Sequence, residues 1–173
     1  MGKSCGQGMQ RMHKSAFDLM AEFLNGVDGE GLDVLDVGSL DVNGSYRELI
    51  EGRGWNYTGL DMRPGKNVDV VPDDPFHYPF DDGAFDVVIS GSTMEHVTHI
   101  WEWVPEVARL VRPGGWLCII THHSFPEHRY PLDCWRILPD GIEVLFNRAG
   151  TLTNYEISMP TNIDIIGIAQ KCE

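Results

Sequence analysis

Two acidic residues that end apolar runs carry the clearest chemical signal in this sequence. The run 33–37 contains Asp36 and leads into Gly38, and 25 positions after Asp36 a second run ends at Asp61. Gly38 has no side chain, so its loop lets a ligand approach the backbone, while the Asp61 carboxylate can accept both hydroxyls of a ribose. The pattern predicts a nucleotide-type α/β site.

Glu95 and His96 are adjacent titratable residues that follow another apolar run, at 85–90. A carboxylate or an imidazole placed at the end of a strand can take a proton from a bound substrate. The alternative is that the pair only caps the helix that follows it.

Three histidines and an aspartate have the residue types of a metal site: His122, His123, His128 and Asp133. Adjacent residues at a strand end usually point apart, and nothing in the sequence places all four side chains on one face. The sequence therefore predicts no metal site.

Alternating strands and helices must position these residues. Apolar periodicity predicts strands at 33–37, 55–60, 67–71, 85–90, 116–122, 154–159 and 163–170, with helices at 15–25, 45–51, 100–111 and 139–149. Only three residues join the last two strands, which forbids a parallel pair. The sequence thus predicts an α/β fold: one doubly wound, Rossmann-like sheet of seven strands, mostly parallel with an antiparallel C-terminal strand.

Length and composition fit one domain without a membrane or nucleic-acid role. The 173 residues are 42% hydrophobic, enough for one core, and we expect residues 1–14 to be a flexible segment ahead of a domain at 15–173. The formal net charge of −13 repels a phosphate backbone, and no apolar run is long enough to cross a bilayer. Four scattered cysteines and no signal peptide indicate reduced thiols and a cytoplasmic location.

Five motifs, taken in order, resemble those of the class I S-adenosylmethionine-dependent methyltransferases, most closely their small type 11 branch. The motifs lie at residues 33–38, 59–61, 78–86, 92–97 and 110–115, and the likeness extends over residues 15–171. The ordered set is more specific than any single motif. The resemblance implies S-adenosylmethionine as the cofactor, a methyltransferase domain at 15–173, and the sheet order 3-2-1-4-5-7-6 with the seventh strand reversed.

The resemblance also implies the cofactor contacts. Asp36 and Gly38 would lie beside the methionine moiety, Asp61 on the ribose hydroxyls, and Asp74 (or Asp73) near the adenine amino group. The remaining predicted cofactor contacts are Ser39, Met62 and Ser90.

The first loop departs from the family, because Leu40 and Val42 take the places of its second and third glycines. This departure leaves the contacts of residues 39–43 open. A nicotinamide-binding oxidoreductase is one alternative function, but it needs Gly-x-Gly-x-x-Gly for the pyrophosphate, and Leu40 blocks that approach. A catalytically inactive methyltransferase-like binding module is the other, and only the altered loop favours it.

The resemblance favours direct, metal-free transfer of the sulfonium methyl to an oxygen or nitrogen of a small-molecule acceptor, because the sulfonium is already an activated electrophile. His96 is the first candidate for the catalytic base and Glu95 the second. The acceptor side is predicted in the loop 125–136, with His128, Arg129, Tyr130, Asp133, Trp135 and Arg136 as candidate acceptor-binding residues.

The arginines of this loop suggest the charge of the acceptor. Arg129 and Arg136 could hold a carboxylate or phosphate bidentately, so we expect a small anionic acceptor such as a sugar phosphate or a nucleotide-linked sugar. The alternative is that one arginine pairs with Asp133 and braces the loop. The chain has no inserted lid domain, so its own loops, its N-terminal helix or a second subunit of a homo-oligomer would cover the acceptor.

Overall fold

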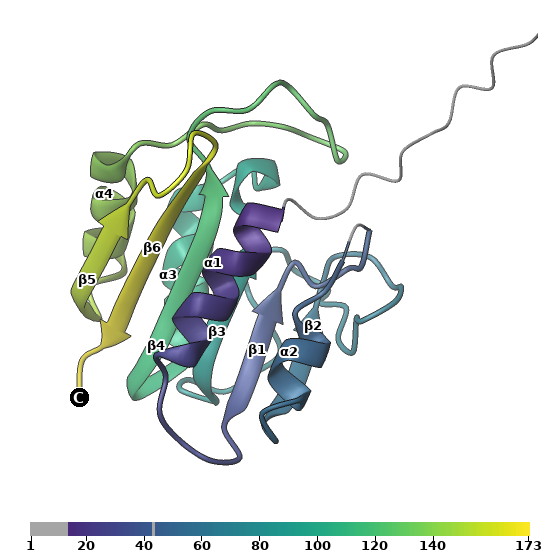
Figure 1. Ribbon diagram of the computed structural model, residues 1–173, viewed down its shortest axis with the longest axis vertical. Coiled ribbons are helices and arrows are strands. Elements are labelled where there is room, and N and C mark those ends of the chain that lie inside the picture. Colours follow the sequence, from purple (N-terminus) through teal and green to yellow (C-terminus); the bar gives the residue numbers. More distant parts are fainter. Residues whose placement is uncertain (1–13, 43) are drawn as a thin grey trace, which may run out of the picture.

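A six-stranded sheet lies at the centre of the computed structural model, which describes residues 14–42 and 44–173 (Figure 1). The strands are β1 (Asp33–Val37), β2 (Asn56–Leu60), β3 (Phe85–Gly91), β4 (Val111–His122), β5 (Leu152–Ser158) and β6 (Asp164–Lys171). They lie in the order β2-β1-β3-β4-β6-β5; β6 runs antiparallel to both neighbours and the other pairs are parallel. The predicted sheet with its reversed C-terminal strand is confirmed.

The prediction of a seventh strand, at 67–71, is wrong for the described residues. Val70 makes one isolated parallel bridge with Leu60. Asp69 turns its carboxylate toward the sheet, where Oδ2 accepts the Gly59 N–H at 2.8 Å, so a side chain replaces a backbone partner. Asn67 has a φ of 68°, a left-handed conformation that also interrupts an extended segment.

Helices cover both faces of the sheet. α1 (Lys14–Asn25) and α2 (Arg47–Glu51) pack on one face, and α3 (Ile100–Leu110) and α4 (Pro139–Ala149) pack on the other (Figure 1). Side chains alternate along β3, so Val87 and Ile89 join the core under α1 while Val88 joins the core under α3. A strand covered on both faces needs apolar residues at nearly every position, which explains the run at 85–90.

Several element boundaries differ from the predicted ones, mostly by one or two residues. α1 includes Lys14, which was predicted to belong to the flexible segment. Residues 1–13 of that segment lie outside the described residues. α2 begins at Arg47, after a turn in which Ser45 Oγ accepts the Arg47 N–H at 3.0 Å. β4 begins at Val111 rather than 116, with a shift of register against β3.

Pro105 marks the place where α3 is joined to α4. Proline has no N–H, so the carbonyl of Trp101, one turn earlier, lacks its helical donor. Arg148 Nε of α4 donates to that carbonyl at 2.8 Å. The helix therefore continues through the proline, and the substitute donor comes from the neighbouring helix.

Within the described part of the chain, no helix combines the length and the apolar character that a membrane span requires. Cys118, Cys134 and Cys172 are free thiols, and Cys5 lies outside the described residues.

Candidate functional site

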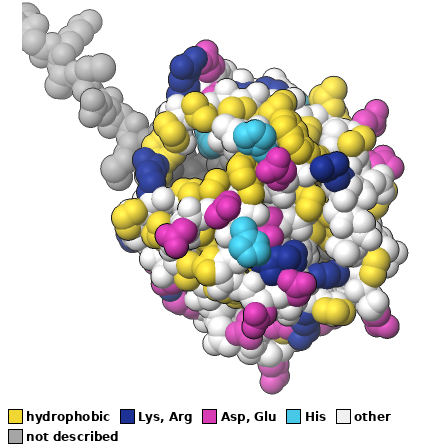
Figure 2. Space-filling view, turned by 180° about the vertical axis from the view of Figure 1, so that it is seen from behind, with side chains coloured by type: hydrophobic (Ala, Val, Ile, Leu, Met, Phe, Trp, Pro, Cys, Tyr) yellow, Lys and Arg dark blue, Asp and Glu magenta, His cyan; other side chains and the backbone are white. Residues whose placement is uncertain are grey.

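A cavity of about 560 Å³ opens where the parallel strands end. Loops that follow β1, β2, β3 and β4 line it, and this is the edge where open α/β sheets bind ligands. Figure 2 shows a hollow edged largely by hydrophobic side chains, with histidines beside it. Small-molecule sites have volumes of roughly 300–1,000 Å³. The predicted site residues that line the cavity are Asp36, Gly38, Ser39, Asp61, Met62, His96, His128, Arg129 and Tyr130.

Gly38 lets the loop after β1 pass close to the turn after β3. Its φ is +86°, and a Cβ at this position would lie 2.0 Å from Thr93 Oγ1. Its N–H donates to the Leu60 carbonyl at 2.8 Å, which ties the loop to the end of β2. The neighbouring loop therefore requires glycine here, independently of any ligand.

The two residues that replace family glycines, Leu40 and Val42, both line the cavity. Asp41, between them, forms an ion pair with Lys66 Nζ at 2.6 Å, and its N–H donates to the Lys66 carbonyl at 3.1 Å. Asn43 lies outside the described residues. The loop after β1 is thus held by the segment after β2 rather than by a succession of glycine turns.

Asp61 presents its carboxylate to the cavity at the end of β2. Oδ2 accepts the Leu40 N–H at 3.3 Å, and Oδ1 accepts the Arg63 N–H at 3.0 Å. An ionised carboxylate has about four lone-pair sites, so both oxygens keep capacity for ligand hydroxyls. The geometry is compatible with the predicted ribose contact, which stays a prediction.

Asp36 is the buried acid of the site, with 3% of its surface exposed. Its Oδ2 accepts the Tyr57 hydroxyl at 2.7 Å. Burial raises the pKa of Asp36 to about 7; the Tyr57 hydrogen bond opposes this rise and the Asp61 charge adds to it. A cationic group bound beside Asp36 would favour its ionised form.

Replacing Asp36 by asparagine should make stability less dependent on pH. The pKa of this carboxyl rises from 3.8 to about 7 on folding, so between these values the folded state binds more protons than the unfolded state. The wild-type free energy of unfolding should therefore fall as pH rises through this window. When the pH rises from about 5 to about 8, the free energy of unfolding of Asp36→Asn should increase by about 2 kcal/mol relative to that of the wild type, as measured by urea unfolding. A constant difference between the two proteins would contradict the raised pKa.

Two predicted cofactor contacts do not line the cavity. Ser90 is fully buried, and its hydroxyl donates to the Val37 carbonyl at 2.7 Å, which joins β3 to β1. Asp74 lies on an exposed loop and accepts the Phe76 N–H at 2.7 Å, while its neighbour Pro75 lines the cavity. Ser90 therefore positions the end of β1, and Asp74 would need a loop movement to reach a ligand.

Two buried hydroxyls in the lining lack partners. Ser39 Oγ and Tyr46 OH accept or donate no hydrogen bond within the described ranges 14–42 and 44–173. Buried polar atoms are normally paired, so these two mark places for polar atoms of a ligand. The sequence predictions had no functional role for Tyr46 or for the cavity residues Tyr78 and Trp103. An aromatic residue inside the small-residue loop was the available signal for Tyr46.

The 3₁₀ helix η1 (Met94–His96) carries the two predicted catalytic residues to different depths. His96 lines the cavity, and its Nδ1 lies 2.5 Å from the Leu132 carbonyl. That contact requires a proton on Nδ1, which leaves Nε2 as the proton acceptor. Glu95 is fully buried, and its Oε2 accepts the Thr121 hydroxyl at 2.8 Å. His96 can therefore reach a ligand directly, whereas Glu95 lies behind the histidines.

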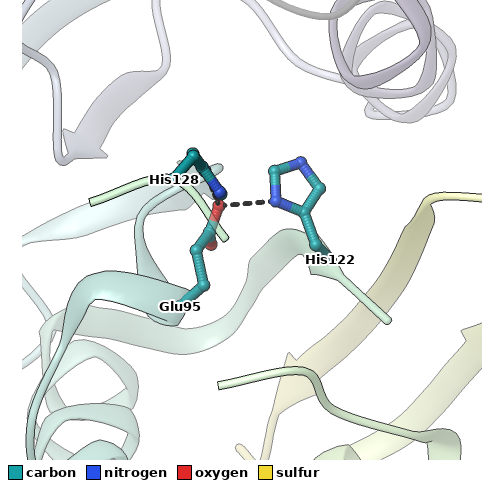
Figure 3. A group of neighbouring side chains, drawn as sticks. All are labelled: Glu95, His122 and His128. Atoms are coloured by element: carbon teal, nitrogen blue, oxygen red, sulfur yellow. Dashed lines mark ion pairs between the residues drawn. The ribbon is translucent and has the colours of Figure 1, made fainter. Parts of the chain in front are cut away.

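The structure brings together two of the four residues that the sequence suggested as metal ligands. His122 and His128 both lie beside Glu95 (Figure 3). His123 turns its Nε2 to a backbone carbonyl, and Asp133 is paired inside its own loop. The argument that neighbouring side chains point apart holds for His122 and His123, but the chain reverses before His128.

Arg136 braces the loop after β4 through two hydrogen bonds to Asp133. Its Nη1 and Nη2 donate to Asp133 Oδ1 and Oδ2 at 2.7 and 2.8 Å, and its Nε donates to the Phe125 carbonyl at 2.9 Å. The Arg136 guanidinium holds the pKa of Asp133 well below its usual range. Arg129 lines the cavity but pairs with the exposed Glu127 at 2.6 Å. The pair of Arg136 and Asp133 is the one that the alternative prediction described, in which an arginine braces the loop.

Two other residues of this loop, Trp135 and Tyr130, were predicted to bind the acceptor. Trp135 donates its Nε1–H to the Val97 carbonyl at 2.7 Å and packs against the core, and it does not line the cavity. Tyr130 lines the cavity, and the Arg63 guanidinium lies 4.4 Å from the centre of its ring. This cation–π contact joins the loop after β2 to the loop after β4 across the cavity.

Replacing Arg136 by lysine should destabilise the fold through this loop. Lysine keeps the charge but cannot hold Asp133 by two parallel hydrogen bonds. Because a hydrogen bond to a charged group contributes about 1.5–3 kcal/mol and Arg136 is partly exposed, we expect a loss of about 1 kcal/mol in urea unfolding. Arg129→Lys is the matched control and should leave the free energy of unfolding nearly unchanged, since its pair is exposed. Equal losses in the two variants would contradict the bracing role.

Comparison with known proteins places the site in context. Residues 35–119 match a family described as "Methyltransferase domain". The 2-methyl-6-phytyl-1,4-hydroquinone methyltransferase of Synechocystis sp. is 32% identical over 117 residues, which are 61% of this chain and 36% of that protein. The fatty-acid O-methyltransferase of Mycolicibacterium smegmatis is 30% identical over 154 residues, 80% of this chain and 54% of that protein. The chain therefore spans between a third and just over half of the length of these relatives.

A solved structure agrees at the level of the fold. The 1,6-didemethyltoxoflavin-N1-methyltransferase of Burkholderia thailandensis, solved with 1,6-didemethyltoxoflavin and S-adenosylhomocysteine, superposes with a TM-score of 0.68. The match covers 96% of this chain and 80% of that chain at 15% sequence identity. At this identity, the comparison supports the architecture described above and nothing finer.

Proposed function

We propose that this chain is a class I S-adenosylmethionine-dependent methyltransferase of the type 11 branch, as the family match at residues 35–119 supports. It transfers the sulfonium methyl of S-adenosylmethionine to an oxygen or nitrogen of a small acceptor. The observation that carries the proposal is the continuity of the cavity. One volume joins Asp36, Gly38 and Asp61 on one side to His96 and His128 on the other. Cofactor and acceptor could therefore lie in contact, as an in-line displacement requires.

The cavity wall supports an acceptor with an apolar body in place of a sugar phosphate. The aromatic residues that line it are Tyr46, Tyr78, Trp103, Phe125 and Tyr130. Arg136 pairs with Asp133, which favours a bracing role for this arginine over the two-arginine clamp of an anionic acceptor. The two curated relatives are named for a phytyl-hydroquinone and a fatty acid, which both join an oxygen-bearing head to a hydrocarbon chain. Only the name of the fatty-acid relative specifies O-methylation, and on that basis we propose oxygen as the methylated atom.

In this mechanism the acceptor oxygen attacks the methyl carbon opposite the sulfur. The new O–C bond forms as the S–C bond breaks, and the electron pair of the broken bond returns to sulfur, which becomes a neutral thioether. The proton of an acceptor hydroxyl passes to His96 Nε2, whose lone pair is fixed by the Nδ1 contact with Leu132. The sulfonium is already an activated electrophile, so the methyl donor itself needs no Lewis acid.

Net charge supports the proposed class of acceptor, and the free cysteines support the proposed location. The net charge of −13 favours a small-molecule acceptor over a nucleic acid. The free thiols at Cys118, Cys134 and Cys172 are consistent with the proposed cytoplasmic location. A homo-oligomer is proposed only as one way to cover the acceptor.

Calorimetry followed by turnover tests this function. S-adenosylmethionine and NAD are titrated separately, and labelled methyl transfer is then measured to a long-chain fatty acid, an alkyl hydroquinone and a sugar phosphate. We expect binding of S-adenosylmethionine only, with transfer to one of the two apolar acceptors. Binding of NAD alone would favour the oxidoreductase. Binding of S-adenosylmethionine without transfer to any acceptor would favour the inactive module.

A further inference from the structure

One buried carboxylate oxygen, Glu95 Oε1, lies at the centre of three imidazole nitrogens. His122 Nδ1 is 3.0 Å from it, His96 Nε2 is 3.9 Å away and His128 Nε2 is 4.0 Å away. The Glu95 side chain is 0% exposed, while His122 and His128 also line the cavity. Figure 3 shows the Glu95 carboxylate between His122 and His128, which come from the end of β4 and the loop after it.

The outer atoms of each group face other polar atoms. Thr121 Oγ1 donates to Glu95 Oε2 at 2.8 Å. His128 Nδ1 lies 3.3 Å from the Pro126 carbonyl and 3.4 Å from Asp133 Oδ2, which both favour a proton on that nitrogen. A proton on Nδ1 leaves the Nε2 lone pair directed toward Glu95.

His122 also lies between two carboxylates, with Glu95 near its Nδ1 and Asp164 near its Nε2. Its Nε2 faces Asp164 Oδ1 at 3.8 Å, and Asp164 is fully buried. A proton on Nε2 leaves the Nδ1 lone pair beside Glu95 Oε1. Metal-binding histidines commonly have a carboxylate or carbonyl on the far ring nitrogen, which fixes the tautomer and the ring orientation. His128 therefore has acceptors within reach of its outer nitrogen, and the buried Asp164 carboxylate lies near the outer nitrogen of His122.

A positive charge would be stabilised between these groups, either as a proton on His122 Nδ1, 3.0 Å from Glu95 Oε1, or as a metal ion. In these tautomers a buried carboxylate oxygen and two nitrogen lone pairs converge, and such an arrangement is costly without a cation. A divalent metal binds nitrogen and oxygen ligands at about 2.0–2.2 Å, which places the ligand atoms about 3.0–3.5 Å from one another. The separation of Glu95 Oε1 and His122 Nδ1 is 3.0 Å and fits this spacing. His128, at 4.0 Å and on a loop, would have to move inward by about 0.5 Å.

We propose that Glu95, His122 and His128 bind one divalent transition-metal ion at the acceptor end of the cavity. Two imidazoles and one carboxylate favour ions such as Zn²⁺, Fe²⁺, Co²⁺ or Mn²⁺ over Ca²⁺ and leave coordination positions open. Those positions would face the cavity and take an oxygen of the acceptor. The acceptor contact rests on the proposed function, whereas the metal site does not. This proposal replaces the metal-free prediction for the acceptor half of the site.

The test measures metal content directly. The full chain, purified without a histidine tag, is saturated with Zn²⁺, desalted and analysed for bound metal, and the Co²⁺ form is examined by visible absorption. We expect one ion per chain and a ligand-field spectrum of bound Co²⁺. Glu95→Gln and His128→Asn should each lower the affinity for the ion by about 10-fold or more. His123→Asn is the matched control, because His123 adjoins His122 but its Nε2 faces the Thr161 carbonyl at 3.0 Å.

His128→Asn keeps the test decisive if Glu95→Gln fails to fold, because His128 lies partly exposed on a loop. Wild-type protein that binds S-adenosylmethionine but retains no ion would overturn the proposal and show that protons neutralise the cluster. Equal loss of metal in His123→Asn would also overturn it. Stoichiometric metal without any methyl transfer would leave the metal site standing while the proposed function fails.

Discussion

Replacing His96 by asparagine is expected to lower kcat for a hydroxyl acceptor by about 100-fold or more, because general base catalysis contributes about 10²–10⁴-fold. The asparagine amide can donate to the Leu132 carbonyl as His96 Nδ1 does, so the turn after β3 should keep its position. The variant lacks an atom equivalent to Nε2, which is the proton acceptor in the proposed mechanism. Single-turnover methyl transfer and calorimetry with S-adenosylmethionine measure the loss of rate and the unchanged cofactor affinity.

His99→Asn is the matched control for this variant. His99 lies three positions further along, is exposed and does not line the cavity. Its replacement should change kcat by less than about twofold, since exposed positions away from the site have small effects. If His96→Asn kept the wild-type rate, the acceptor would already be ionised when it binds, and no protein base would be needed. If cofactor affinity fell together with kcat, His96 would be a structural residue of the turn.

The parts of the fold that sequence patterns predicted depend on local rules. The helix at 139–149 has its predicted bounds, because proline at the first helical position and Gly150 after the last one mark its two ends. The hairpin of β5 and β6 was predictable because the predicted connection of three residues, which spans 159–163 in the structure, is too short for a crossover. The continuous apolar run of β3 indicated a strand covered on both faces, and its two core clusters confirm this.

The expected strand at 67–71 shows where local rules fail. Apolar residues at 68, 70 and 71 favour a strand, but Asp69 between them finds a better partner in the Gly59 N–H and pairs with Arg47 at 2.6 Å. Both contacts depend on residues that become neighbours only after folding. Propensity could not predict them, because they compete with strand pairing through tertiary structure.

The residues of the candidate site also fall into two groups: those that strand ends place by a local rule, and those whose position depends on tertiary structure. Asp36 and Asp61 reach the cavity because each lies at or just after the carboxyl end of a parallel strand, and such ends share one edge of the sheet. Ser90 also ends a strand, but its side chain bonds to the neighbouring strand instead. The cluster of Glu95, His122 and His128 depends on how the loop after β4 turns back over η1. No sequence periodicity describes that reversal, so the metal ligands could not be grouped in advance.

Replacing Asp61 by alanine should weaken S-adenosylmethionine binding roughly tenfold to a hundredfold. A charge-assisted hydrogen bond contributes about 1.5–3 kcal/mol, and the variant would leave the ribose hydroxyls without their proposed acceptor. Asp61 also accepts the N–H groups of Leu40 and Arg63, so alanine removes a brace from two loops as well. Asp61→Asn separates these effects, because its amide oxygen can keep one of the backbone contacts while the charge is lost. We expect it to lose affinity for the cofactor but to keep the wild-type midpoint in thermal unfolding.

Asp74→Ala is the matched control for the cofactor experiment. Both carboxylates were predicted to contact the cofactor, but Asp74 is exposed and does not line the cavity. Its replacement should change the Kd for S-adenosylmethionine by less than about twofold. If Asp61→Ala bound the cofactor like the wild type while Asp74→Ala did not, the ribose would lie nearer the loop at 72–76 than the end of β2. The cofactor would then be bound in a different orientation along the sheet edge, and the roles proposed for His96 and His128 would need a different acceptor position.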